Sequence, residues 1–125
     1  MRLPVGGRRL AGAAVSPRRH LLYGLDGAGE PVPLEIAAEA DVAGWGAVFA
    51  DPNRVVAQDT VAGRVLSTVF LGIDYGFGSG PQQLYETAVF GSRQEVSVLR
   101  RWATRAEAAE GHARILAEMV ERLGP

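Results

Sequence analysis

The chain of 125 residues contains no cysteine and no lysine, and each absence excludes certain kinds of chemistry. Without cysteine there is no disulfide, no thiol nucleophile and no zinc held by thiolates. Stability then does not depend on an oxidising compartment, which favours the cytoplasm. All 13 basic residues are arginine, so a P-loop, a Schiff base and a Ser–Lys dyad are excluded as well. No apolar run approaches the roughly 18 residues of a membrane-spanning helix, so we expect no contact with a membrane.

Charge is distributed unevenly along the chain. Residues 1–19 carry five arginines and no acid, which leaves eight arginines against 14 acids, a net charge of −6, in residues 20–125. An acidic body argues against nucleic-acid binding, which depends on neutralising phosphates, except through the Arg-rich N-terminus. We expect residues 1–19 to be a disordered extension and residues 20–125 to form a single domain.

From residue 20 onward, the apolar patterns and turn signals predict elements in the order β-β-α-β-β-β-α. Residues 20–35 are predicted to form a loose hairpin, because two prolines restrict this segment to a sheet edge. Residues 40–50, with Asp41 as N-cap, predict a short helix. Three further strands are predicted, with a minor one after them: residues 54–60, 65–74 and 84–90, then 96–98.

The last element is predicted to be a long helix that begins at Thr104, which forms a capping box with Glu107. An apolar stripe at three- and four-residue steps predicts the face that packs on the sheet. Its members are Ala109, His112, Ala113, Leu116, Met119, Val120 and Leu123. The predicted class is therefore α+β, with an antiparallel sheet of about four or five strands and both helices packed on it. Four aromatic residues are expected in the core: Trp45, Phe49, Phe70 and Phe90.

The segment 65–91 has the sequence VLSTVFLGIDYGFGSGPQQLYETAVFG. It resembles a family of small uncharacterised proteins of bacteriophages and prophages, whose recurring pattern is roughly VSTVFLGLDHxFGxGPPLLFETMVFGG. The matching positions are Ser67 to Gly72, Asp74, Phe77, Gly80, Pro81, Leu84, Glu86, Thr87 and Val89 to Gly91. Flanking matches, such as Trp45 and Arg101 to Thr104, extend the resemblance over about residues 20–118.

The resemblance implies a small phage or prophage accessory protein, but it implies no mechanism. The chain departs from the family pattern at Tyr75, where the family commonly has histidine. If the activity of the family depended on that histidine, this member would have lost or altered it. Smaller departures are Tyr85, Ala88 and Arg105.

Asp74 and Glu86 are the acids with the clearest chemical potential. They lie on strands predicted to be adjacent, near a glycine-rich loop, and two neighbouring carboxylates could bind a divalent metal or share acid–base work. The predicted register places position 74 near position 85, so the two need not share a face. The favoured interpretation is structural: Asp74 starts the turn, and Glu86 forms a cross-strand pair or accepts from loop amides.

His112 lies on the apolar stripe of the C-terminal helix. A single histidine in that position is more often a packed core residue than a catalyst or a ligand. The second histidine, His20, lies in a predicted loose segment, so no metal site is expected. A hydrogen bond between Glu86 and His112 across the sheet–helix interface is a testable alternative.

The loop 76–80 joins strand to strand and therefore lacks the helix N-terminus that makes phosphate-binding loops effective. It is predicted to be a hairpin tip that presents Tyr75 and Phe77 to a partner. A buried Phe77 is an equally weighted alternative.

Three functions remain open from the sequence. The preferred one is a non-enzymatic phage-type accessory domain that binds another protein. The second is a small metal-dependent hydrolase that uses Asp74 and Glu86, with His112 as a further weak candidate. The third is an assembly component that pairs with a copy of itself through a sheet edge or an apolar helix face. No cofactor is expected.

Overall fold

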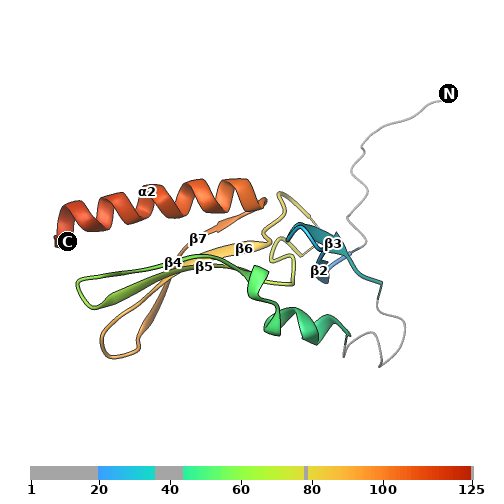
Figure 1. Ribbon diagram of the computed structural model, residues 1–125. Helices are drawn as coiled ribbons and strands as arrows, with labels where there is room; N and C mark the ends of the chain where they lie inside the picture. The colour runs from blue at the N-terminus through green and yellow to red at the C-terminus, as the bar shows by residue number, and fades with distance from the viewer. Residues whose placement is uncertain (1–19, 36–43, 78, 125) are drawn as a thin grey trace.

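The computed structural model describes residues 20–35, 44–77 and 79–124. It shows the predicted α+β class, with a long helix, α2, lying along one face of an antiparallel sheet (Figure 1). The sheet has the order β4-β5-β6-β7, and a separate two-stranded hairpin, β2-β3, precedes it. The bounds are β2 Tyr23–Leu25, β3 Pro31–Pro33, β4 Val55–Val61, β5 Arg64–Phe70, β6 Tyr85–Phe90, β7 Val96–Trp102 and α2 Arg105–Leu123.

Strands β4 and β5 are joined by a two-residue turn at Ala62 and Gly63. Both residues have positive φ, 50° and 78°, as a hairpin turn matched to the twist of the strands requires. The turn makes β4 and β5 neighbours, and β6 pairs on the other side of β5. The strand predicted to be the most apolar therefore lies inside the sheet, as its composition indicates.

β5 ends at Phe70, not at Asp74 as predicted. Gly72 has a φ of +78°, a conformation outside the strand region, and a Cβ there would press against the Trp45 side chain. The predicted register is wrong for the same reason: Phe70, not residue 74, pairs with Tyr85. Beyond the break the chain makes only an isolated bridge between Ile73 and Leu22.

The short predicted helix is only partly helical within the described residues. Helical residues 44–46 continue into a 3-10 helix, η1 (Ala47–Ala50), and a second one, η2 (Pro52–Arg54), follows. The proposed cap Asp41 lies outside the described residues. Trp45 stabilises this segment because its indole N–H donates to the carbonyl oxygen of Gly72, at 2.9 Å.

Helix α2 begins as predicted, because Thr104 is the N-cap and its hydroxyl accepts from the N–H of Glu107. The Glu107 carboxylate accepts from Ala103, one residue before the N-cap. The face of α2 that packs on the sheet is rotated by one position from the predicted stripe. Ala108, Gly111 and His112 are buried, and His112 is the only one of the seven predicted stripe members among them. The other six are not buried: Leu116 and Met119 lie at intermediate positions, and Ala109, Ala113, Val120 and Leu123 are exposed.

The core lies between α2, the sheet and the first hairpin. Its buried members are Tyr23, Val48, Phe70, Leu84, Tyr85 and Ala108. Phe70 was predicted correctly, but Phe49 and Phe90 are 47% and 40% exposed, so their assignment to the core is wrong. Phe90 points away from α2, and Phe49 stacks edge-on against the half-buried Trp45.

Tyr85 is fully buried, and its hydroxyl has no hydrogen-bond partner of good geometry. Burial raises the pKa of Tyr85 above its ordinary value of 10.0; the nearby Arg105 guanidinium acts in the opposite direction but is the smaller influence. Arg105 directs its Nη1 to the carbonyl oxygens of Gly29 and Asn53 instead. The phenolic oxygen is therefore a buried polar atom with little compensation.

We expect Tyr85→Phe to raise the free energy of unfolding by up to about 1 kcal/mol at neutral pH, because it removes this hydroxyl. The folded state of the parent protein keeps the phenolic proton to a higher pH than the unfolded state does. Stability should therefore fall as the pH rises above about 10, and this fall should be smaller in the variant. Urea unfolding over an alkaline pH series measures both effects, and a large loss of stability at neutral pH would contradict the interpretation.

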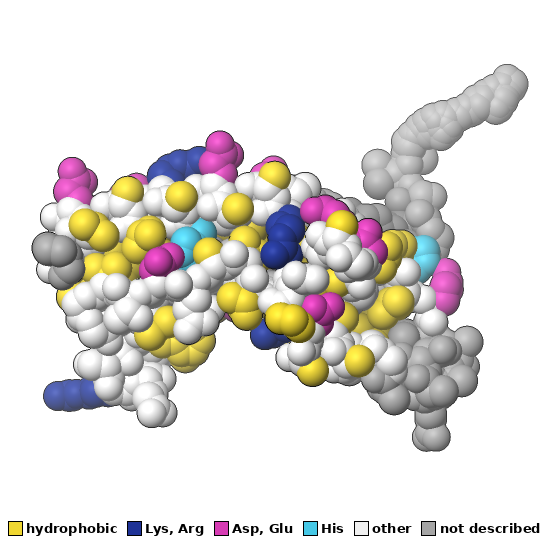
Figure 2. Space-filling view, in the orientation of Figure 1, with side chains coloured by type: hydrophobic (Ala, Val, Ile, Leu, Met, Phe, Trp, Pro, Cys, Tyr) yellow, Lys and Arg dark blue, Asp and Glu magenta, His cyan; other side chains and the backbone are white. Residues whose placement is uncertain are grey.

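The sheet has one covered and one open face. Because residues paired across antiparallel strands share a face, the register assigns the open face to Val55, Gln58, Thr60, Val65, Ser67, Val69, Glu86, Ala88, Phe90, Val96, Val98 and Arg101. Within the described residues, no helix or second sheet is stacked on these side chains (Figure 1). Figure 2 shows hydrophobic side chains emerging on the side of the sheet that faces away from α2.

Candidate functional site

A chain of five polar side chains, of which the middle three are buried, crosses the interface between α2 and the sheet. His112 contacts Thr68 through Nδ1 at 2.7 Å and Asp59 through Nε2 at 2.8 Å. Thr68 and Thr87 lie side by side on β5 and β6, with their hydroxyl oxygens 2.6 Å apart. The indole N–H of Trp102 donates to the Thr87 hydroxyl at 2.9 Å. The five side chains therefore form one continuous hydrogen-bond chain.

One arrangement of the hydrogens satisfies every donor along this chain. At one end Trp102 can only donate, and at the other the ionised Asp59 can only accept. A neutral His112 that carries its proton on Nε2 donates to Asp59 and accepts from Thr68. Thr68 then accepts from Thr87, which accepts from Trp102. With this single tautomer, every side-chain donor along the chain has an acceptor.

An acid, a histidine and a hydroxyl in a row also describe the arrangement that activates a nucleophile. Here the hydroxyl belongs to Thr68, which is fully buried between the sheet and α2, and His112 is only 3% exposed. A substrate cannot reach a hydroxyl that is enclosed on all sides. The arrangement therefore links α2 to the sheet through buried hydrogen bonds. His112 is the packed core residue that the sequence favoured.

The predicted hydrogen bond between Glu86 and His112 is wrong. Both ring nitrogens of His112 bond to Thr68 and Asp59, and Glu86 lies on the open face, where it accepts from Arg101 Nε at 2.9 Å. The cause is the alternation of side chains along β6, which directs Thr87 toward α2 and Glu86 away from it. The Glu86–Arg101 pair is the cross-strand pair that was expected as the structural role of Glu86.

Asp74 is fully buried and organises the long connection between β5 and β6. Its Oδ1 accepts from the backbone N–H groups of Gly76, at 2.8 Å, and Gln83, at 2.9 Å. The structure does not bring Asp74 and Glu86 into one hydrogen-bond network. Among residues 20–35, 44–77 and 79–124, no group of three acidic or histidine side chains is arranged to hold a metal ion.

The loop that Asp74 organises presents an aromatic pair. Phe77 is 68% exposed, more than any other large hydrophobic side chain of the described residues, and its ring lies 5.8 Å from that of Tyr75. The Arg101 guanidinium stacks on Tyr75, 4.5 Å from the ring centre. Phe77 also has a φ of 52°, which is costly for a bulky side chain. The alternative of a buried Phe77 is therefore wrong.

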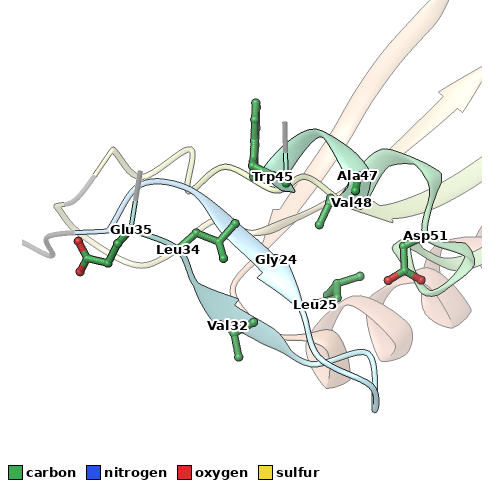
Figure 3. Close-up of a pocket in the computed structure, with 10 residues that line it drawn as sticks. Gly24, Leu25, Val32, Leu34, Glu35, Trp45, Ala47, Val48 and Asp51 are labelled. Carbon is green, nitrogen blue, oxygen red and sulfur yellow. The ribbon is translucent and has the colours of Figure 1, made fainter. Parts of the chain in front are cut away.

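A pocket of about 410 Å³ lies between the β2-β3 hairpin and η1 (Figure 3). Leu34 and Val48 point into it, while the Trp45 ring points away. Its two acids have other partners, since Glu35 contacts His20 and Asp51 caps η2. Among the described residues that line it, the pocket therefore offers apolar surface, and both of its acids are already bonded.

Three comparisons with known proteins place no further constraint on the chain. No protein-family model matches it, and no curated protein or solved structure matches it either. Among the described residues, no helix has both the length and the apolar character needed to cross a membrane.

Most of the polar chain was not predicted from the sequence. His112 was singled out, but Asp59, Thr68, Thr87 and Trp102 were not. Threonine is common in strands for its shape alone, so Thr68 and Thr87 carry no local signal of their role. They could have been identified only by their place among the apolar residues of the buried face of the sheet. That face is known only once the position of α2 on the sheet is known.

Proposed function

We propose that this chain is a non-enzymatic, phage- or prophage-type accessory domain that binds another protein through the loop around Tyr75 and Phe77. The observation that carries the proposal is Phe77, a large apolar side chain that is both exposed and in a left-handed backbone conformation. Glycine or asparagine would occupy such a position at lower cost. An energetically costly residue at an exposed tip is typical of a functional site.

The described residues that flank the tip of the loop are held in place by contacts with Asp74 and Arg101. The Asp74 carboxylate holds both sides of the loop, and Arg101 holds Tyr75 from the sheet. A rigid aromatic side chain loses little conformational entropy on binding. We therefore expect the partner to offer an apolar pocket that receives the Phe77 ring, as aromatic anchors require at other interfaces.

Phe77→Asn separates binding from folding. Asparagine tolerates the left-handed region, so we expect the free energy of unfolding to stay the same or rise by up to about 1 kcal/mol. Capture of the partner from lysate of an infected or lysogenic host should be lost. Leu123→Asn is the control, because Leu123 is 41% exposed and lies far along α2. Equal capture by both variants would exclude the loop as the main contact.

A photoreactive residue gives a direct test. Benzoylphenylalanine at position 77 should form a covalent adduct with one host or phage protein on irradiation, whereas the same residue at position 49 should not. Phe49 is a matched control because it is also a phenylalanine, 47% exposed, on a different segment. No specific adduct from position 77, together with metal-dependent turnover of a phosphodiester, would favour the hydrolase alternative instead.

A further inference from the structure

We infer that the open face of the four-stranded sheet is an interface that packs against the same face of a second copy of this chain. The open face lies on the strands and meets the loop at Arg101, whose guanidinium stacks on Tyr75; the inference does not require the loop to bind a partner. Four of its apolar side chains are well exposed: Val55 41%, Phe90 40%, Val96 55% and Val98 51%. A contiguous apolar patch of this kind on a sheet is typical of an interaction surface.

The sheet edges are poorer candidates than the face. β7 is an edge strand, but it contains a bulge next to Val98 and carries Arg100 and Arg101. The other edge strand, β4, is also bulged, between Val55 and Ala57. Bulges and charged residues are the features by which proteins prevent strand addition at an edge. On the open face, Arg101 is paired with Glu86 and seven of the twelve assigned side chains are apolar, so face-to-face packing fits the structure better than extension of the sheet.

The charges on the open face favour a second copy over an unrelated partner. Of the residues that the register assigns to this face, only Glu86 and Arg101 are charged, and they lie side by side on β6 and β7. A twofold axis presents the same patch from both copies. Glu86 of one copy can therefore lie opposite Arg101 of the other, and the four charges neutralise each other at the end of the face where Val55 and Val69 also lie.

The shape of the face is also suitable. A hollow of about 330 Å³ lies on it, lined by Val69, Glu86 and Ala88 among others, with room for an apolar side chain from the second copy. Two twisted sheets pack about 10 Å apart when apolar side chains fill the space between them. The face measures about 19 by 20 Å from strand spacing and length, or roughly 400 Å² per copy. This is less than the roughly 800 Å² per partner of a standard interface, so we expect a weak, concentration-dependent dimer.

Sedimentation velocity of the full chain, from low to high micromolar concentration, tests the inference. The wild-type protein should shift from monomer to dimer. Val98→Lys should weaken self-association about tenfold or more, because it adds a buried charge beside Arg101. Val120→Lys is the matched control, since Val120 is 40% exposed on α2, and it should leave the dimer unchanged. The inference would be overturned if the wild-type chain stays monomeric over this range. Equal effects of the two variants on self-association would also overturn it.

A mixing experiment tests the contact between copies. Glu86→Arg and Arg101→Glu should each be monomeric alone, because four like charges then meet at the axis. An equimolar mixture should form a heterodimer, since each copy supplies what the other lacks. Circular dichroism of each variant checks that both are folded. A mixture that remains monomeric would overturn the proposed packing. If Glu86 and Arg101 interact only within one copy, adding the second variant cannot restore their ion pair.

Discussion

His112→Ala is expected to lower the free energy of unfolding by about 3–5 kcal/mol, the largest effect of any single substitution considered for this protein. The imidazole is 3% exposed, so its removal leaves a cavity beneath α2. The Thr68 hydroxyl, which is fully buried, also loses one of its two hydrogen-bond partners. Domains of this size are commonly stable by about 5–15 kcal/mol, so the loss is a large fraction of the total. Urea unfolding followed by circular dichroism measures it.

A double-mutant cycle separates the hydrogen bond from the cavity. His112→Leu keeps much of the volume, and Thr68→Val keeps the shape of the strand residue, yet each alone leaves a buried polar group without its partner. Each should cost about 2 kcal/mol or more, and the double variant should cost clearly less than the sum. Asp59→Ala is the control within the same network. Asp59 has a side chain that is 44% exposed, so water can replace its carboxylate as the acceptor for His112 Nε2. Its removal should therefore cost less than about 1 kcal/mol. Additive losses in the cycle would show that Thr68 and His112 are not coupled.

Gly111→Ala is expected to destabilise the protein by about 2–3 kcal/mol, although the same substitution at an exposed helix position normally stabilises by about 1 kcal/mol. A Cβ at Gly111 would overlap the six-membered ring of Trp102. The ring cannot move away easily, because its N–H is bonded to Thr87 and Arg100 stacks on its face at 5.0 Å. Thermal or urea unfolding measures the change.

Two further variants check the cause of this effect. Gly46→Ala is the matched control, because no atom lies within 4 Å of its added Cβ; it should be neutral or slightly stabilising. Trp102→Phe removes the ring atoms that the new Cβ would meet. In that background Gly111→Ala should cost much less than in the wild type. If the cost is unchanged, the overlap with Trp102 is not the reason for the glycine.

Features encoded by neighbouring residues were predicted well from the sequence. The start of α2 depends on Thr104 and Glu107, three residues apart, and the structure confirms Thr104 as the cap. β4 and β6 differ from their predicted ranges by one residue at their ends. The α+β class follows from such elements in order. The limits of β5 and β7 were predicted less well, because Gly72 and the partner strand decide where they end.

Features that depend on distant residues were not predicted. The face of α2 is set by the contact of Gly111 with Trp102, which no periodicity within the helix reveals. The apolar positions that were assigned to the buried stripe, such as Val120, therefore lie on the exposed side. Likewise, the exposure of Phe49 and Phe90 follows from where the sheet is covered, not from their chemistry. The role of Phe77 was left open for the same reason.

The polar chain also determines which elements of the protein unfold together. It joins residues that are 44 and 53 positions apart in the chain, so α2 cannot leave the sheet without breaking hydrogen bonds held by β4, β5 and β6 together. Amide protons in α2 and in these strands should therefore exchange with solvent in one cooperative step. The β2-β3 hairpin lies outside this polar chain, and an isolated bridge between Leu22 and Ile73 joins its N-terminal side to the segment that follows β5. Its amide protons should exchange earlier, at a lower free energy of opening.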